Sequence, residues 1–426
     1  MRASARVFVF FIKAHFLTRT VFHPLSLALA AIVLLYGSPA AAQATSGEPD
    51  PAKVRIRMGP LWLNPTIALA NIGVDKNVFN EPDDANPKSD FTFTLQPATD
   101  LWLHTGPTWV TGRVQEDLVW FQTYSSERGV NATYSVGWLV PLTRLRFNVG
   151  ATRRNRRDRP GFEIDARSQR LETEYNGAVE LRTLSKTYFG VTGSRQRVDF
   201  DKDAVFLNSS LQFELNRVTT AAGVTLRYQL TPLTGLTFAA TRSEDRFEFS
   251  SLRDSNSTAA TATVNFDPLA LIRGSATIGY RDFEPLSAGL SPYEGLTAAA
   301  NLSYVLFGAT KFAVGLNRDV QYSYDVNQPY YLETAVSGSI AQQLFGPIDV
   351  VARAGVDTLA YRDRVGAAVQ VSSRVDRGHS FGAGVGYHTS SGFRIGFDVD
   401  QINRVSDISS RQFDDLRIGS SVTYVF

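Results

Sequence analysis

Residues 415–426 read DLRIGSSVTYVF and end the sequence. Every second residue of this stretch shares one face, which carries Leu416, Ile418, Ser420, Val422, Tyr424 and Phe426, and the other face carries Asp415, Arg417, Gly419, Ser421, Thr423 and Val425. A period of two predicts a β-strand whose faces meet different surroundings. The alternation is longer than the ~5–6 residues usual for strands of soluble sandwiches. It suits the ~9–11 residues with which a β-strand crosses a bilayer.

The same pattern recurs through the chain and predicts about eighteen strands. We expect them at 61–75, 89–104, 107–123, 130–140, 143–154, 166–182, 185–199, 217–231, 234–249, 256–267, 270–283, 294–306, 310–324, 330–344, 348–362, 375–389, 392–405 and 412–426. A count of sixteen or twenty strands is also possible. A further hairpin in 200–216 would raise the count to twenty. Pro97 predicts a bulge or break in its strand. Arg242 and Arg318 fall on the apolar face, which predicts bulges near them.

Breaks between these segments are alternately short and long. Thr231-Pro232-Leu233 is a short break, whereas 155–165 and 200–216 are long polar ones. The polar face of the strands carries charges of both signs in mid-strand, which a water-filled lumen tolerates and a packed core does not. The sequence therefore predicts an all-β fold, a transmembrane antiparallel up-and-down β-barrel with short periplasmic turns and longer extracellular loops.

The first residues are typical of an export signal. Basic residues precede the apolar run Leu25–Tyr36, and Ala40-Ala41-Ala42 provides a small-residue cleavage site. We therefore expect a cleaved signal peptide at 1–42, a flexible periplasmic lead-in at 43–59 and a barrel at 60–426, placed in the outer membrane of a Gram-negative-type envelope. An uncleaved N-terminal anchor is the alternative.

Composition excludes several classes of function. The 426 residues include 0 Cys, so cysteine-ligated metals, disulfides and thiol nucleophiles are excluded. The 43 basic and 41 acidic side chains nearly balance, which does not indicate nucleic-acid binding. No cofactor, metal site or catalytic residue is predicted, and we expect a protein that is not an enzyme.

The alternation also selects candidate site residues. Charged side chains on the polar face are the candidate pore lining: Arg113, Asp117, Arg146, Arg170, Glu172, Glu174, Arg227, Arg273, Arg281, Asp349, Arg353, Asp357, Arg394, Asp398, Asp400 and Arg417. Aromatic residues near strand ends are candidates for the membrane-interface girdle: Trp120, Tyr124, Tyr322, Tyr324, Tyr361 and Tyr424. Tyr424 and the terminal Phe426 resemble the C-terminal signal that outer-membrane proteins present to the barrel-assembly machinery.

Short motifs carry a family resemblance. Val74-Asp75-Lys76-Asn77-Val78-Phe79, Arg159-Pro160-Gly161, Glu163-Ile164-Asp165-Ala166-Arg167, Leu215-Asn216-Arg217 and Leu230-Thr231-Pro232-Leu233-Thr234 resemble landmarks of the putative β-barrel porin 2 family, with coverage of roughly 60–426. Position 74 is Val where the family favours an aromatic residue. The resemblance implies an outer-membrane barrel, in some members linked to exopolysaccharide export, and brings no catalytic motif.

A barrel of this width predicts an aqueous channel, because 16–18 strands leave the lumen open. The first hypothesis is a porin-like channel that passes solutes through a mixed-charge lumen. The second is a conduit of an exopolysaccharide export system, with periplasmic export components as partners. The third is a non-conducting structural or enzymatic barrel. Outer-membrane lipid and the assembly machinery are the partners common to all three, and a loop at 200–216 folded into the lumen would restrict a pore by size.

Overall fold

The computed structural model describes residues 49, 51, 54–267, 270–344 and 346–425. The predicted signal peptide, the first part of the lead-in and Phe426 lie outside the described residues. In the described end of the lead-in, β1 (Ile56–Met58) pairs with the first long strand.

The described residues form one large antiparallel sheet of 19 strands, of which the short β1 pairs only with β2, leaving eighteen that form a ring. These strands are β2 (Leu61–Asp75), β3 (Asp90–Thr105), β4 (Thr108–Phe121), β5 (Gly129–Pro141), β6 (Leu145–Asp158), β7 (Ser168–Arg182), β8 (Thr187–Phe200), β11 (Arg217–Thr231), β12 (Thr234–Phe247), β13 (Ser255–Phe266), β14 (Ile272–Pro285), β15 (Tyr293–Leu306), β16 (Thr310–Tyr322), β17 (Tyr330–Gln343), β18 (Ile348–Arg362), β19 (Val375–His388), β20 (Phe393–Val405) and β21 (Phe413–Val425). The predicted strand order and count are confirmed.

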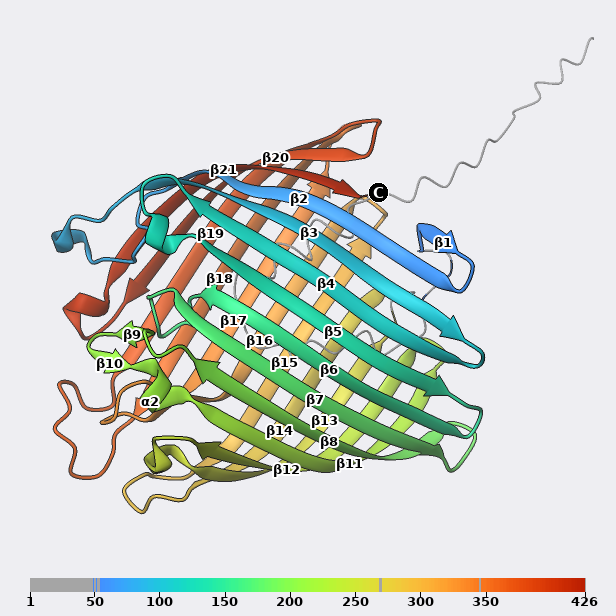
Figure 1. Cartoon of the computed structure of the whole chain (residues 1–426), viewed down its shortest axis with the longest axis horizontal. Helices are drawn as coiled ribbons and strands as arrows, with labels where there is room; N and C mark the ends of the chain where they lie inside the picture. The colour runs from blue at the N-terminus through green and yellow to red at the C-terminus, as the bar shows by residue number, and fades with distance from the viewer. Residues whose placement is uncertain (1–48, 50, 52–53, 268–269, 345, 426) are drawn as a thin grey trace, which may run out of the picture. The chain divides into compact units, whose positions relative to one another are not determined.

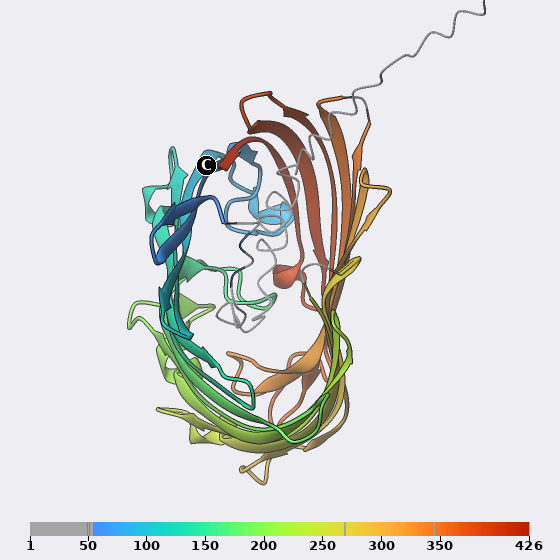
Figure 2. The ribbon, with the colours of Figure 1, turned by 90° about the vertical axis from the view of Figure 1, so that its right-hand side faces the viewer.

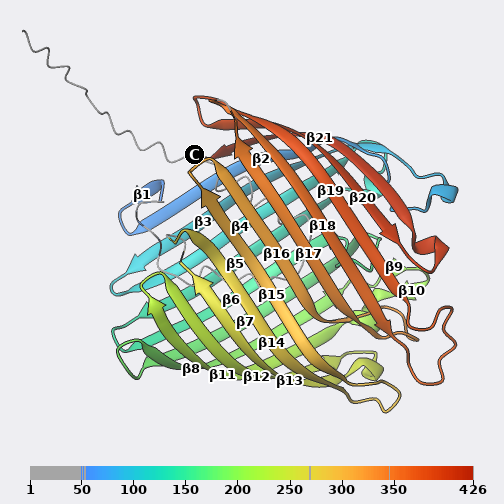
Figure 3. The same cartoon turned by 180° about the vertical axis from the view of Figure 1, so that it is seen from behind.

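The last strand closes the ring on the first. β21 pairs with β2 from Thr66↔Val425 to Asp75↔Arg417, and every other neighbour in the ring is the next long strand along the chain. Figure 2 shows the closed ring along its axis, and Figure 3 shows its far wall. Closure pairs the backbone groups of both edges, which is the condition for a sheet to cross hydrocarbon.

The connections separate by length onto the two ends of the barrel (Figure 1). At one end the turns are tight: between β15 and β16 the amide of Ala309 donates to the carbonyl of Leu306, and the two central residues of this turn, Phe307 and Gly308, both adopt positive φ, as a type I′ turn requires. The opposite end carries the loops with β9 (Val205–Phe206), β10 (Ser209–Ser210), α2 (Leu211–Leu215) and the 3₁₀ turns η2 (Asp83–Ala85), η3 (Ser125–Glu127), η4 (Ser251–Arg253) and η5 (Ser409–Arg411). No helix of the described residues is long and apolar enough to cross a membrane.

The two faces of the sheet differ as the alternation predicts. Large apolar side chains on one face remain exposed, among them Tyr175 (58%), Ile278 (58%) and Phe381 (57%). An apolar surface of this extent around a whole barrel suits lipid, not water. Residues of opposite parity, which include the candidate pore-lining charges, face the lumen.

Bulges occur elsewhere than predicted. β3 continues through Pro97, but its pairing with β4 is interrupted at Gln96 and Pro97 without a change of register. The register shift lies on β2 beside Asn71, whose φ is positive. The strand pairings at Arg242 and Arg318 show no shift. Both arginines therefore stay on the outer face, since only an extra residue in the strand would turn them inward.

Candidate functional site

The inner wall of the barrel is lined by ion pairs, some of which join strands that are two apart in the ring. Arg353 on β18 donates to Asp400 (2.6 Å) and Asp398 (3.0 Å), which lie two strands away on β20. Arg227 on β11 makes two hydrogen bonds to Glu180 on β7, at 3.1 and 2.7 Å. Such charge-assisted pairs hold the side chains flat along the wall.

A run of glycines makes room for these pairs. A Cβ atom at Gly382 would lie 2.1 Å from an Asp400 oxygen, and one at Gly384 would lie 2.2 Å from an Asp398 oxygen. Both glycines lie on β19, the strand between the paired residues. The Gly-rich stretch of β19 is therefore a passage for side chains that cross from β18 to β20.

The candidate pore-lining residues all lie in strands of the ring with the inward parity. The structure pairs most of them along the wall: Arg113 with Asp100, Asp117 with Gln96 and Gln115, Arg170 with Asp158 and Glu172, Glu174 with Arg154, Arg281 with Asp319, Asp349 with Arg394 and His388, and Arg417 with Asp415. Arg146 lies over the ring of Tyr188, and within the described residues neither Arg273 nor Asp357 forms a salt bridge.

The loop of residues 159–167, between β6 and β7, reaches across the lumen. Its anchors lie on β17, β18, β20 and η5, on the opposite side of the ring from β6 and β7. A loop can contact strands half a ring away only by crossing the interior. We call residues 159–167 the crossing loop.

Asp165 is the centre of the contact with the far wall. Its carboxylate accepts hydrogen bonds from Arg404 (2.6 Å) and Arg411 (2.9 Å), and from Asn80 of the β2–β3 loop (3.1 Å). The guanidinium of Arg404 also donates to the carbonyl of Phe162, and that of Arg411 to the carbonyl of Glu163. All of these charged groups are buried, so each depends on the others for its partners.

Apolar contacts reinforce this attachment on both flanks. Phe162 packs against a buried cluster of Tyr331, Leu359 and Tyr361 on β17 and β18. Ile164 packs in a second buried cluster with Phe206 and Leu211, which belong to the loop of residues 201–216. That second loop was the sequence-based candidate for the inward loop, and it does pack against the crossing loop.

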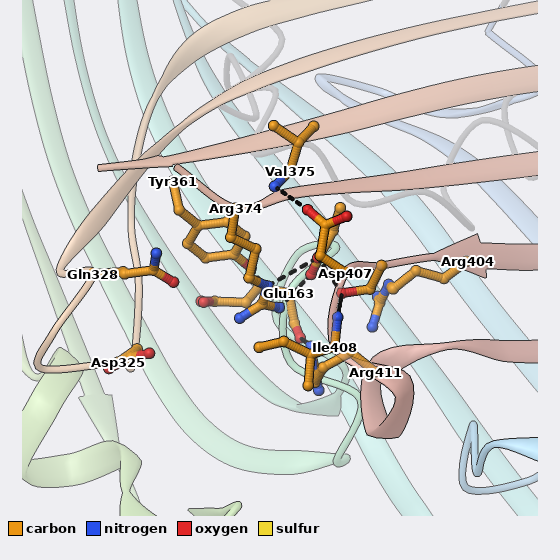
Figure 4. A network of polar contacts seen from close by, with 12 residues as sticks. Glu163, Asp325, Gln328, Tyr361, Arg374, Val375, Arg404, Asp407, Ile408 and Arg411 are labelled. Atoms are coloured by element: carbon orange, nitrogen blue, oxygen red, sulfur yellow. Dashed lines mark hydrogen bonds and ion pairs between the residues drawn. The ribbon is translucent and has the colours of Figure 1, made fainter. Parts of the chain in front are cut away.

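Glu163 lies buried beside the β16–β17 loop, among the groups drawn in Figure 4. Its carboxylate accepts hydrogen bonds from Ser323 Oγ (2.6 Å) and the Tyr324 amide (3.3 Å). Burial raises the pKa of Glu163 to about 7, and these bonds and the nearby Arg411 and Arg374 lower it by less. The carboxyl group of Glu163 therefore titrates near pH 7, because burial favours its protonated, uncharged form.

A cavity of about 270 Å³ opens beside this network, lined by residues of four loops. Its polar lining includes Asp325, Gln328, Arg374, Ser410 and Arg411. Figure 4 shows Arg374 and Arg411 beside Glu163, so two arginines that line the cavity also lie against the crossing loop. The loop end of the lumen is therefore a narrowed, polar mouth.

Three of the aromatic residues assigned to the membrane interface are wrongly placed by the sequence analysis. Tyr322 packs on Phe247 and hydrogen-bonds Ser255, Tyr324 packs on Phe206, and Tyr361 is buried against Arg374. Tyr322 and Tyr324 lie inside the barrel because the β16–β17 hairpin leaves β15 beyond the pair Ala298↔Arg318, and Tyr361 lies inside because it has the inward parity of β18. Trp120 is exposed on the outer face and Tyr424 stacks on Phe393, whereas Tyr124 lies in a loop against Phe79.

Sequence reasoning missed the residues that anchor the crossing loop. Glu163 and Asp165 were noted only as part of a family motif, and Arg404 has the inward parity that would have selected it. Arg411 lies in a loop, where no periodicity indicates its partner. Among the described residues no group of three or more His, Cys, Asp or Glu side chains could hold a metal ion.

No curated protein sequence matches the chain. Solved structures that are similar include the outer membrane protein opdK from Pseudomonas aeruginosa (12% identity, 85% of this chain, 98% of that chain, TM-score 0.45). A BenF-like porin from Pseudomonas fluorescens Pf-5 is also similar (14% identity, 85% of this chain, 98% of that chain, TM-score 0.45). So is Pseudomonas aeruginosa OccK2 in complex with glucuronate (12% identity, 85% of this chain, 98% of that chain, TM-score 0.46).

One family model covers nearly the whole barrel and its lead-in. It is described as "Putative beta-barrel porin 2" and matches residues 49–426. The match includes every strand of the ring and the crossing loop, and it confirms the resemblance drawn from the short motifs. The chain belongs to the putative beta-barrel porin 2 family.

Proposed function

We propose that this protein is an outer-membrane channel that passes small hydrophilic solutes through its lumen. The observation that carries the proposal is the closed ring of eighteen strands with ionised side chains along its inner face. A ring of this size is too wide for side chains to fill. Charges on its inner face are stable only if water reaches them, so the lumen is a continuous aqueous path.

The crossing loop sets the size of what passes. It occupies part of the lumen at the loop end and is fixed to the far wall through Asp165, Arg404 and Arg411. A loop fixed in this position narrows the lumen at the loop end of the barrel and leaves the lumen open at the end with the short turns. The channel therefore favours small solutes. Its polar mouth favours solutes whose hydrogen bonds with water can be replaced by hydrogen bonds with the side chains of the lining.

Localisation follows from the same architecture. An apolar outer face on a closed barrel requires a bilayer, and long loops at one end with short turns at the other are typical of the outer membrane. The predicted export signal at 1–42 supports delivery there, and the aromatic ending at Tyr424 and Phe426 supports recognition by the assembly machinery. No observation among the described residues favours exopolysaccharide export or an enzyme.

Liposome swelling tests the proposal. Barrels whose folding is shown by heat-modifiable migration are reconstituted and challenged with a pentose, a disaccharide and a heptasaccharide. We expect swelling rates that fall steeply with solute size. Replacement of residues 160–166 by a Gly-Ser linker removes the anchors and should admit the disaccharide faster. Folded barrels that admit no solute in either form would refute the channel.

A further inference from the structure

A separate group of charges lies on the outer face of the barrel. It contains five arginines, which we call the outer arginine patch: Arg153 on β6, Arg195 and Arg197 on β8, and Arg242 and Arg246 on β12. They have the same parity as exposed apolar residues of their strands, such as Phe189 on β8 and Phe238 on β12. The patch therefore faces away from the lumen, and the channel does not use it.

Three of the five arginines lack an acidic partner. Arg197 pairs with Asp199 (2.8 Å) and Glu248 (3.4 Å), and Arg246 pairs with Glu244 (3.2 Å). Within the described part of the chain, no ion pair or hydrogen bond is made by the side chains of Arg153, Arg195 and Arg242. The patch therefore keeps an excess of positive charge.

The cross-strand neighbours of these three arginines show that the excess is not relieved locally. Arg153 lies between Tyr134 and Thr173, Arg195 between Tyr175 and Thr220, and Arg242 between Ala222 and Thr258. None of these neighbours is acidic. An acidic residue opposite each arginine would be the simplest way to neutralise it, and the sequence does not supply one.

The height of the patch on the barrel indicates what surrounds it. Phe189, Leu226 and Phe238 form one apolar row across β8, β11 and β12. Arg195 and Arg197 lie six and eight residues beyond Phe189 toward the loop end, which is about 15–20 Å along the membrane normal for strands tilted by ~40°. The apolar band of such barrels is only ~25 Å tall. Arg195 and Arg197 thus lie at the edge of the band, at headgroup level on the loop side.

The surface is hollowed at this point. An open hollow of about 490 Å³ is lined by four arginines, Arg195, Arg197, Arg217 and Arg246, by three acidic residues, Asp199, Glu244 and Glu248, and by Val218, Thr220 and Phe247. Arginine guanidinium groups bind phosphate oxygens in pairs, with strong directional hydrogen bonds. We propose that the outer arginine patch is a binding site for a phosphorylated lipid headgroup of the outer leaflet.

The inference rests on the membrane placement of the barrel and not on conduction through it, so each can fail without the other. The probe is diphosphoryl lipid A, doped into micelles of a non-ionic detergent that hold the folded protein, with bound lipid counted by native mass spectrometry. In the combined variant R153Q, R195Q and R242Q, we expect affinity to fall at least about tenfold, because each arginine near a membrane surface contributes to the attraction of anionic lipid.

Matched variants separate this site from general surface charge. R318Q removes an outward arginine of β16, across the ring, that already hydrogen-bonds Thr334, and it should change affinity less than twofold. E244Q removes a carboxylate from the hollow and should tighten binding. Equal binding by the wild type and the triple variant would overturn the proposal. So would undiminished binding of the dephosphorylated lipid, or displacement of lipid A by millimolar inorganic phosphate, which would indicate a site for a free anion.

Discussion

Replacement of Asp165 by Asn should release the crossing loop from the far wall. The side chain keeps its size, but the two buried guanidinium groups of Arg404 and Arg411 lose the negative charge between them. Arg404 is 7% exposed and Arg411 is 3% exposed. Water therefore cannot replace the lost partner while the loop stays docked.

The size of the effect follows from this burial. Removal of one partner from a buried ion pair costs about 3–5 kcal/mol. The lower end applies here, because the Asn oxygen still accepts one hydrogen bond and both arginines keep a backbone carbonyl of the loop. A cost of about 3 kcal/mol raises the undocked fraction of the loop roughly 100-fold.

Thiol labelling measures that fraction directly. The wild-type chain has 0 Cys, so Ile164→Cys places a single thiol in the loop at a position that is 3% exposed. The thiol reacts with a maleimide only when the loop undocks. We expect labelling about 100-fold faster in the D165N background than in the wild-type background, both carrying the same cysteine.

Asp158→Asn is the matched control. Asp158 also pairs with an arginine, Arg170, but on the wall at the base of the loop, and its side chain is 39% exposed. Labelling in that background should change less than threefold. Equal labelling rates with and without D165N, in barrels that fold, would refute the conclusion that Asp165 holds the loop in place.

Three further predictions concern the loop, the lumen and the wall. The pKa of Glu163 rises from its ordinary 4.5 to about 7 when the loop docks, so the docked loop is most stable below pH 4.5, loses stability as pH rises toward 7 and changes little above pH 7. Labelling of the loop cysteine, corrected for thiol ionisation, should therefore accelerate several-fold from pH 5.5 to 7.5. The E163Q variant should abolish this change. R353Q leaves Asp398 and Asp400 facing the lumen without their cation, so the reversal potential in a potassium chloride gradient should move toward cation selectivity; an unchanged potential would place these charges outside the ion path. G384V places methyl groups where an Asp398 oxygen lies and should lower the temperature of heat modification, consistent with a cost of about 1–3 kcal/mol for overpacking; an unaltered temperature would show that the passage is loose.

The fold could be predicted because lipid and water impose a strict alternation on every strand. A register slip by one residue would place charges such as Arg353 in lipid, so the sequence must mark each strand plainly. The bounds of β2, β11 and β18 match the predicted segments to the residue. The bulge at Asn71 was not predictable, because a single Asn at positive φ leaves no periodic signal.

The mouth of the lumen was less predictable than the wall. The contacts of Asp165 with Arg404 and Arg411 join residues far apart in the chain, and the loops that bring them together have no repeat. Aromatic residues near strand ends suggest a girdle, but Tyr361 has the inward parity and packs on a buried arginine. Parity was therefore the better guide at Tyr361, but not at Tyr322, which shares the outward parity of Arg318 and still packs on Phe247 inside the barrel.

Single-channel conductance in a planar bilayer tests the central claim most directly, that the barrel is an aqueous channel narrowed by the crossing loop. The wild type and the D165N variant are compared at the same salt concentration, after both are shown to be folded. The account predicts steady steps for the wild type, and larger or additional steps for D165N as the loop leaves the lumen. Folded barrels of both kinds that give no steps would contradict the channel, and identical steps would contradict the role of the loop.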